Sequence, residues 1–302
     1  MTAASFLSLG FRGTIDFFIT SFEVSEIVSS GFYFVVSTPF RAKNFQIILK
    51  NFEKIDTIVP PTSTEGVRKK SIFFRSGVIV FLIILYILDL FMWGNDSWAG
   101  LNNYFAYYVL CTVGITHELQ YWHLVSLMQD RVIAFNDKIR SNIERSKVLD
   151  NVQDIIKIHD CVCDTVDAIN SCFNISASLL ILSCYINLVV CPYVLFVMMT
   201  SNEINVLNFV YFIWIFLHIS RIMVLVNVCH SCEEENQKTN GLILRLLISE
   251  LGVDMKNEIK VLAKKVCRKK IRFSSYGLSK IDRRLILSFY QYILDDFDAV
   301  QL

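Results

Sequence analysis

The chain has 302 residues, of which 54% are hydrophobic, and its mean hydropathy is +0.46. With only 11 Gly and 4 Pro for its turns, it is more apolar than an average soluble domain and has the composition of a helical membrane protein. A net charge of +1 gives no global attraction to nucleic acid, and nine dispersed Cys, several of them inside apolar runs, argue against a disulfide framework. Arg12 and Asp16 interrupt the first apolar stretch, so we expect internal spans, and no orthodox signal peptide, to direct targeting.

The N-terminal part combines an apolar stretch with a basic segment. Residues 17–40 are apolar in their second half but carry Glu23 and Glu26, so this segment is either the first membrane span or a peripheral helix. Residues 41–71 hold many Lys and Arg, and apolar residues recur at helical spacing in their first half. We expect a soluble basic loop containing an amphipathic helix that ends before Pro60.

The strongest predicted span covers residues 72–93. Its core is uncharged, Arg75 can extend to the basic side of the membrane, and Trp93 suits the opposite interface. The loop that follows contains Asn95-Asp-Ser, which is a glycosylation site if this side is extracellular.

Three further spans are expected at residues 103–128, 172–199 and 206–228. The first of them turns polar at His117, so its second half should face other helices, because ionisable groups are costly against lipid. Residues 129–171 are charged and are interpreted as the cytoplasmic extensions of two helices that join near 146–151. Pro192 is expected to kink the second of the three spans.

The charged residues indicate an orientation. Lysine and arginine gather in the three long loops, at residues 41–71, 129–171 and 229–272. The two short loops, 94–102 and 200–205, contain none. By the positive-inside rule the long loops are helical extensions in the cytoplasm. The same orientation places the glycosylation sequon outside the cell.

The closing segment reads FSSYGLSKIDRRLILS from Phe273 and continues as FYQYILDDF to Phe297. It resembles the C-terminal signature of the insect gustatory receptors, a family of seven-helix membrane proteins. In that family F-x-x-x-G-L-F-x-I-D-R-x-L leads into a last helix that carries T-Y, five apolar residues and Q-F. The matching residues are Phe273, Gly277, Leu278, Ile281, Asp282, Arg283, Leu285, Tyr290 and Phe297. The departures are Ser279 for Phe, Phe289 for Thr and Asp296 for Gln, with Gln291 and Asp295 interrupting the apolar run.

The resemblance extends into the middle of the chain. The residues similar to the family's fourth helix and its extension are Tyr104–Tyr108, Glu118–Trp122, Arg131 and Asn136. Those similar to the entry of its fifth helix are His159–Cys161, Asp164 and Ile169–Asn170. On this mapping the chain covers helices two to seven and lacks the first, so we expect a truncated or degenerate copy.

The resemblance implies an all-α, polytopic helical membrane bundle in the plasma membrane, like a seven-helix insect chemoreceptor without its first helix. In the intact family pattern the N-terminus is cytoplasmic. The resemblance also implies a homo- or heterotetramer with other gustatory receptors, surrounded by membrane lipid. This assembly would act as a tastant-gated, non-selective cation channel in chemosensory neurons. The last helix, 281–297, would line the pore. The positions implied for the pore or its gating are Tyr290, Asp296 and Phe297, and those of the family motif are Gly277, Asp282 and Arg283. Packing in a frayed tail is the alternative for this helix, because its closing carboxylates are costly against lipid.

Four tyrosines mark a candidate tastant pocket in the outer half of the bundle. They are Tyr86, Tyr104, Tyr107 and Tyr108. A tyrosine ring offers apolar surface with one hydroxyl, which suits sugars or alkaloids, and interfacial anchoring is the alternative. No metal or cofactor is expected, because His117 and His123 are six residues apart and lie on different sides of a helix.

The sequence contains no acid–base or metal constellation that would indicate an enzyme, and no nucleic-acid partner is expected. The rival to a conducting channel is a non-conducting or degenerate member of the same family. Such a protein would act as a modulatory or scaffold subunit in the membrane. The sequence leaves the tastant and the partner subunits open.

Overall fold

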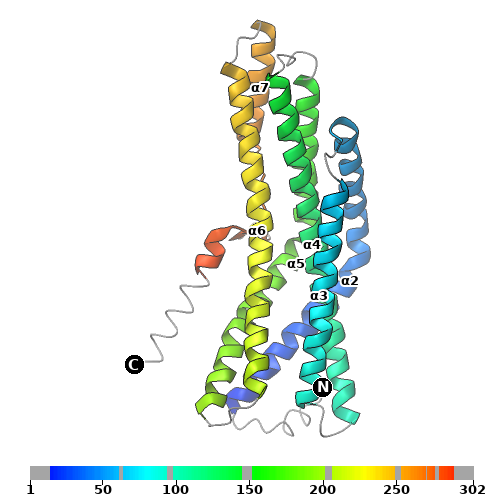
Figure 1. Cartoon of the computed structure of the whole chain (residues 1–302), viewed down its shortest axis with the longest axis vertical. Coiled ribbons are helices and arrows are strands. Elements are labelled where there is room, and N and C mark those ends of the chain that lie inside the picture. The colour runs from blue at the N-terminus through cyan, green and yellow to red at the C-terminus, as the bar shows by residue number, and fades with distance from the viewer. Residues whose placement is uncertain are drawn as a thin grey trace.

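A computed structural model of the chain describes residues 14–60, 64–93, 98–144, 152–200, 206–248, 253–269, 271–275 and 279–288. The helices are α2 (Thr14–Ile58), α3 (Thr64–Trp93), α4 (Trp98–Glu144), α5 (Val152–Thr200), α6 (Val206–Ile248) and α7 (Val253–Arg268). Two short strands, β1 (Ser274–Ser275) and β2 (Ser279–Lys280), and a helical turn over 283–288 follow. The predicted all-α bundle is confirmed, with this small antiparallel ribbon as an addition (Figure 1).

The long helices run along one axis and form an elongated bundle, with α7 at one end (Figure 1). The helices α4, α5 and α6 have 47, 49 and 43 residues. At ~1.5 Å per residue each is roughly 65 to 75 Å long, more than twice the ~30 Å hydrocarbon core of a bilayer. A helix that crosses the membrane here must therefore continue well outside it. By length and composition, Val152–Phe196 and Phe209–Ile248 could each cross a membrane, and Ile72–Leu88 is a shorter apolar helix.

The helix α2 joins two segments that the sequence separates. It runs unbroken through the doubtful span 17–40 and the amphipathic stretch after it, with Pro39 inside the helix. It packs against α5 and α4 and crosses α5 obliquely (Figure 1). At Gly31 the approach is close, because an added Cβ would lie 2.7 Å from a methyl carbon of Leu110 on α4. A glycine at this point lets α2 lie directly against α4.

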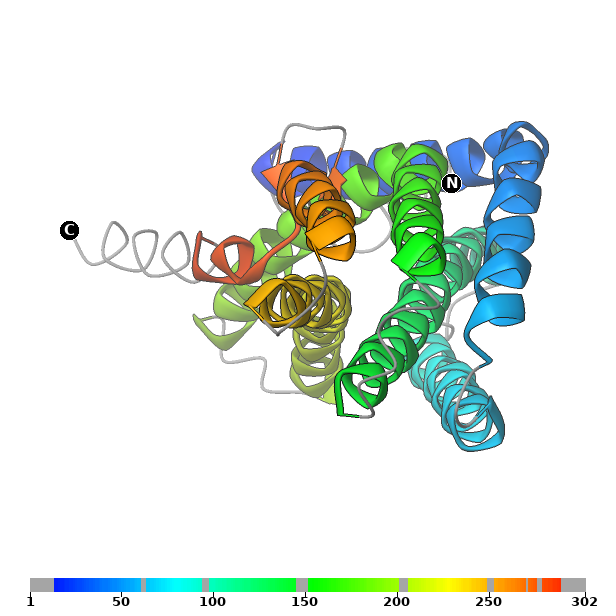
Figure 2. The same cartoon turned by 90° about the horizontal axis from the view of Figure 1, so that it is seen from above.

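The helix α3 lies at the edge of the bundle, beside α4 (Figure 2). It begins at Thr64, earlier than the predicted span, so the basic residues 68–70 belong to the helix and not to a loop. Much of its surface is exposed and apolar, as at Phe73 and Ile79. An apolar outer face is what lipid contact requires and what water would penalise.

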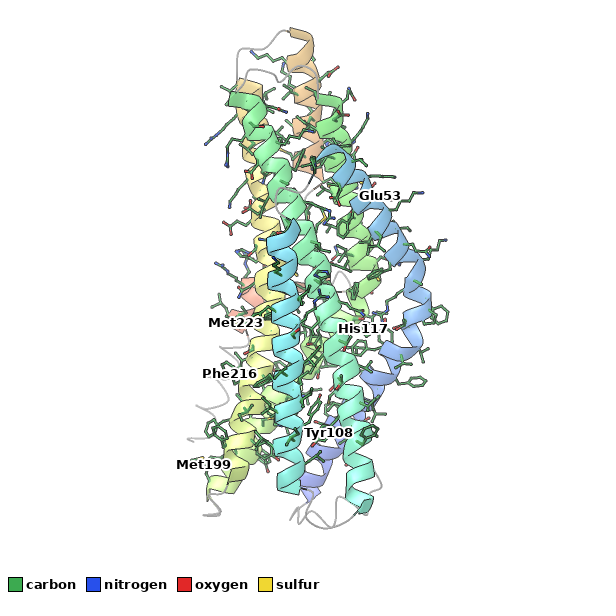
Figure 3. The ribbon with its side chains drawn as sticks, turned by 45° about the vertical axis from the view of Figure 1, so that its right-hand side comes forward. Glu53, Tyr108, His117, Met199, Phe216 and Met223 are labelled. Atoms are coloured by element: carbon green, nitrogen blue, oxygen red, sulfur yellow. The ribbon has the colours of Figure 1, made fainter. Side chains whose placement is uncertain are left out.

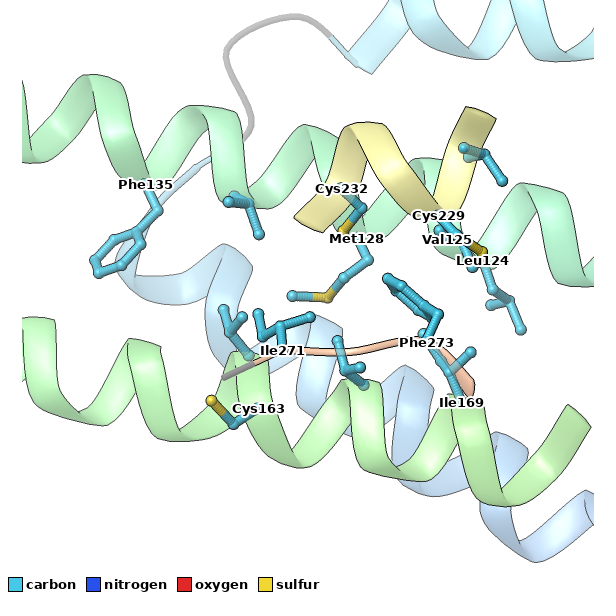
Figure 4. Packing of buried hydrophobic residues seen from close by; sticks show 14 of the residues in the cluster. Leu124, Val125, Met128, Phe135, Cys163, Ile169, Cys229, Cys232, Ile271 and Phe273 are labelled. Carbon is cyan, nitrogen blue, oxygen red and sulfur yellow. The ribbon is translucent and has the colours of Figure 1, made fainter. Parts of the chain in front are cut away.

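The main hydrophobic core lies in the half of the bundle nearer α7 and includes residues of α2, α4, α5, α6, α7 and the C-terminal segment. The segment that inserts into it is the closing ribbon, defined as residues 271–275 and 279–281. Figure 4 shows Phe273 and Ile271 between Val125 and Met128 of α4 on one side and Ile169 of α5 on the other. Phe273 is 0% exposed, so the aromatic residue that opens the closing motif is a core residue.

Ion pairs join α5 to α7 beside this core. Lys265 Nζ lies 2.6 Å from an Asp160 oxygen, and Lys269 Nζ lies 2.7 Å from an Asp164 oxygen. His159, one residue earlier, is buried on the inner side of α5, with Nε2 3.7 Å from the Cys163 sulfur. Burial lowers the pKa of His159 to about 4; the neighbouring Asp160 opposes this shift, and Lys265 and Lys269 add to it.

We expect Phe273→Ala to destabilise the protein by about 3–5 kcal/mol, because it leaves a cavity in a closed core. The melting temperature of the detergent-solubilised protein, followed by size-exclusion chromatography after heating, measures this loss. Phe40→Ala is the matched control, since Phe40 is 78% exposed. Equal melting temperatures for the two variants would contradict the buried position of Phe273.

We expect acid to destabilise the protein through His159. The unfolded chain takes up a proton on this imidazole below its ordinary pKa of 6.5, whereas the folded chain does so only near pH 4. The contribution of the neutral imidazole is therefore complete above pH 6.5 and is lost progressively between pH 6.5 and pH 4. Melting temperatures across this range should fall more steeply for the wild type than for His159→Leu. Parallel pH profiles would contradict the expectation.

Candidate functional site

A buried ion pair joins α4 and α6 within the predicted spans. Arg221 Nε donates to Glu118 Oε2 at 2.9 Å, and Nη2 donates to the other oxygen of the same carboxylate. The Arg221 and Glu118 side chains are 15% and 14% exposed. The third contact of the guanidinium is His218 on the preceding turn, with Nη1 and Nδ1 3.0 Å apart. A two-bond geometry of this kind is the strongest form of an arginine–carboxylate contact.

A small pocket of about 40 Å³ lies beside this ion pair, between α2, α4, α5 and α6. Its wall is mainly apolar and aromatic, with Phe34, Tyr107 and Trp214 among its lining residues. Its polar groups come from α2, α5 and α6, and the ion pair forms part of its lining. An apolar pocket with a few convergent polar groups between helices is the usual form of a small-molecule site.

Two side chains of this pocket carry buried polar atoms that have no hydrogen-bond partner. They are the carboxyl oxygens Oε1 and Oε2 of Glu26 and the ring nitrogen Nε2 of His218. His218 is only 3% exposed. Buried polar side-chain atoms are nearly always hydrogen-bonded, so these atoms are positions where a ligand or water can bind.

A second pocket is also lined by Glu118 and Arg221. It lies between α3, α4 and α6, and almost all of its lining is apolar, with Phe73, Phe81 and Phe216 among the residues. Glu118 and Arg221 line both pockets. The ion pair therefore separates the inner pocket from an apolar groove on the outer face of the bundle.

The structure distributes the four candidate tyrosines over two places. Tyr107 lines the inner pocket. The rings of Tyr86 and Tyr108 stack on each other across α3 and α4, with centroids 4.4 Å apart. Tyr108 lies nearer than His117 to the end of the bundle opposite α7 (Figure 3). The side chain of Tyr104 lies outside the described residues.

A further buried cation, Arg41, lies close to the pocket. Its Nη1 donates to Ser176 Oγ at 2.8 Å and lies 3.3 Å from His117 Nδ1, and the residue is only 9% exposed. The His117 ring stacks on Phe34 of the pocket wall, with centroids 4.9 Å apart. The expectation that Arg41 belongs to a solvated basic loop is therefore wrong. The physical reason is that α2 continues through this position and turns Arg41 towards α4 and α5.

The closing motif is held by a residue that sequence reasoning missed, Glu233 of α6. Its Oε1 accepts the backbone N–H of Phe273 at 3.0 Å, and its Oε2 lies 2.7 Å from Lys280 Nζ. Asp282 follows the ribbon, and its side chain accepts the N–H of Arg284 at 2.9 Å, which caps the turn 283–288. The only signal in the sequence is a run of three glutamates at 233–235, which does not say which one faces inward.

The remaining predicted residues fall as follows. Arg283 is exposed on the turn after Asp282. Gly277, Tyr290, Asp296, Phe297 and Asn95 lie outside the described residues. Their roles in the motif, in the pore and in glycosylation therefore stay predictions.

A bundle of long helices with an apolar outer surface, two of them long and apolar enough to cross a membrane, is the architecture of a multi-pass membrane protein. The chain belongs to the 7tm chemosensory receptor family, whose model matches residues 11–294. It is 24% identical over 131 residues to the Drosophila melanogaster gustatory receptor for sugar taste 43a, a match that covers 43% of this chain and 31% of that receptor.

Two solved structures have the same fold. The insect olfactory receptor OR5 from Machilis hrabei superimposes with a TM-score of 0.71 at 13% identity, over 97% of this chain and 83% of that one. The same receptor in complex with eugenol gives a TM-score of 0.72 at 15% identity, over 98% and 84% of the two chains. The predicted insect chemoreceptor fold is thereby confirmed.

We expect Arg221→Met alone, or Glu118→Leu alone, to cost about 3–5 kcal/mol of stability, because each leaves an unpaired charge among apolar neighbours. The double variant should recover most of this loss. Melting temperatures of the four proteins give the coupling, and Lys157→Met, which breaks an exposed pair on α5, should change little. Additive losses in the double variant would contradict a direct pair.

Proposed function

We propose that this chain is a subunit of a chemosensory receptor that binds a small molecule in the inner pocket and opens a cation channel in response. The ligand is a tastant, the channel is non-selective among cations, and the receptor works in the plasma membrane of chemosensory neurons. The observation that carries the proposal is a pocket inside the bundle with buried, unpaired polar atoms, in a chain of the chemosensory receptor family. Pockets of this kind are where small ligands bind.

Two named relatives support a small-molecule role. The Drosophila receptor is described as a receptor for sugar taste, and the olfactory receptor OR5 was solved in complex with eugenol. A sugar and eugenol are both small molecules with hydroxyl groups. A pocket with apolar walls and a few polar atoms, such as the inner pocket, can contact both parts of such a molecule.

A route from the pocket to the closing segment runs along α6. Arg221 lies at the pocket, and Glu233, which holds the closing ribbon, lies on the same helix. Twelve residues of α-helix separate them by about 18 Å. Ligand binding that shifts or rotates α6 would move the ribbon and the turn 283–288, from which the predicted pore segment continues. Gating needs only that the ligand bind the open arrangement better than the closed one.

The proposal includes an orientation and an assembly. The end of the bundle that carries α7 is cytoplasmic, as the basic loops indicate, whereas α2 begins near the opposite end (Figure 1). The subunits form a homo- or heterotetramer, with lipid around the apolar outer surface. Tyr290, Asp296 and Phe297 are the proposed pore and gating positions.

We expect Glu233→Gln to uncouple binding from opening, because the neutral amide loses the ion pair to Lys280 and weakens the hold on Phe273. Ligand-evoked cation currents in cells that express the chain with a partner receptor should fall at least about tenfold, whereas ligand binding to the purified protein should change little. Glu234→Gln is the matched control, since the Glu234 side chain is 55% exposed.

The same recordings separate the channel from its rival. A chain that binds ligand, carries no current alone or with a partner, and changes the partner's response is a modulatory subunit and not a conducting one. Equal currents in the Glu233 and Glu234 variants would contradict the proposed route along α6.

A further inference from the structure

The charges that line the inner pocket do not balance, since the nearby cation Arg41 contacts His117 and Ser176 and is not part of the lining. Three ionisable side chains that line it are Glu26, Glu118 and Arg221. The two hydrogen bonds of the ion pair assign the guanidinium to Glu118. A second carboxyl group, Glu26, then has no cation of its own among the described residues that line the pocket.

The Glu26 carboxyl group is also unsatisfied at the level of hydrogen bonds. Both of its oxygens are buried and lack a hydrogen bond of good geometry, and the hydroxyl groups next to them, on Ser30 and Ser183, carry no charge. On the opposite side of the pocket, His218 Nδ1 already contacts Arg221, while Nε2 is buried and unpaired. A carboxylate accepts hydrogen bonds only, so the group that would satisfy Glu26 is a donor and, best of all, a positively charged one.

Aromatic rings complete the surroundings. Phe34 comes from α2, Tyr107 from α4 and Trp214 from α6, and all three line the pocket. The Trp214 ring lies parallel to the His218 ring, with centroids 5.9 Å apart. Aromatic faces attract ammonium groups and also accept alkyl chains, so they suit a ligand with a cationic head and an apolar body.

We propose that the ligand of this pocket is a protonated amine with a compact apolar body, and that Glu26 is its counter-ion. This inference rests on the proposed function insofar as the inner pocket is the ligand site. The ammonium group donates to the Glu26 carboxylate and replaces the missing positive charge. The alkyl part lies against the aromatic walls and excludes water from the pair.

Ligands of other charge fit the pocket less well. An anionic ligand would place a third negative charge beside two carboxylates, and the single guanidinium is already bound. A neutral alcohol can donate one hydrogen bond to Glu26 but leaves its charge unbalanced in an apolar environment. The order of affinity expected from charge alone is amine, then alcohol, then acid.

The test uses three probes with the same branched skeleton, namely isoamylamine, isoamyl alcohol and isovalerate. Each is titrated at neutral pH into the full chain in lipid nanodiscs, and binding is read from the rise in melting temperature. We expect isoamylamine to bind at least about tenfold more tightly than isoamyl alcohol, which corresponds to about 1.4 kcal/mol. Isovalerate should give no rise.

Two variants assign the effect to Glu26. Glu26→Gln should remove the preference for the amine, so that the amine and the alcohol bind alike, while it raises the melting temperature of the ligand-free protein by removing an unbalanced charge. Glu53→Gln, an exposed position on the same helix, should leave the preference unchanged. Binding that is equal for the amine and the alcohol in the wild type, tighter for isovalerate, absent for all three probes, or unaffected by Glu26→Gln would overturn the proposal.

This experiment does not depend on ion conduction. If the amine binds as expected but no currents appear in any combination of subunits, the proposed channel function fails and the ligand class stands. If currents follow some other class of ligand and the amine does not bind, the ligand class fails and the channel function stands.

Discussion

Arg221 and Glu118 meet between α6 and α4 in a part of the bundle where most neighbouring side chains are apolar. Neither charge could lie there alone, since an unpaired ion in such surroundings costs several kcal/mol. The pair therefore fixes the register of α6 against α4. It also forms the boundary between the inner pocket and the apolar groove beside α3. The pocket exists in its present form because this pair is closed and because α2, with Gly31 at its crossing, lies directly against α4.

The continuous helix α6 connects the ion pair to the closing ribbon. One helix carries Arg221 at the pocket and Glu233 at the closing ribbon, so a rigid element joins the proposed ligand site to the proposed start of the pore segment. Two contacts hold the closing ribbon in place. Phe273 is buried in the core, and Lys280 forms an ion pair with Glu233. A continuous helix transmits a displacement better than a loop does, and α6 is continuous from the pocket to the ribbon.

Hydropathy predicted the apolar spans but not the length of the helices. Hydropathy falls where the membrane ends, whereas α4 continues as a helix to Glu144, because a helix makes its backbone hydrogen bonds internally and can pack against its neighbours outside the membrane as well. The polar turn at Glu118 was correctly expected to face other helices, yet its partner Arg221 was missed, because one arginine in an apolar run gives no information about what it faces. Pairing across 103 residues, as between these two, is set by the packing of the bundle. Of the tyrosines expected at a ligand pocket, Tyr107 lines the inner pocket and Tyr86 stacks on Tyr108, and their role in binding a ligand stays a prediction.

The account makes α6 the link between the ion pair and the closing ribbon, and hydrogen exchange tests that link most directly. The amide of Phe273 donates to Glu233, and its exchange rate reports local opening of the ribbon. We expect Glu118→Gln, at the pocket, to accelerate exchange in residues 271–281 of the protein in nanodiscs, although the substitution lies far along the bundle. Faster exchange confined to the segments around Glu118 and Arg221, with the ribbon unchanged, would contradict the account.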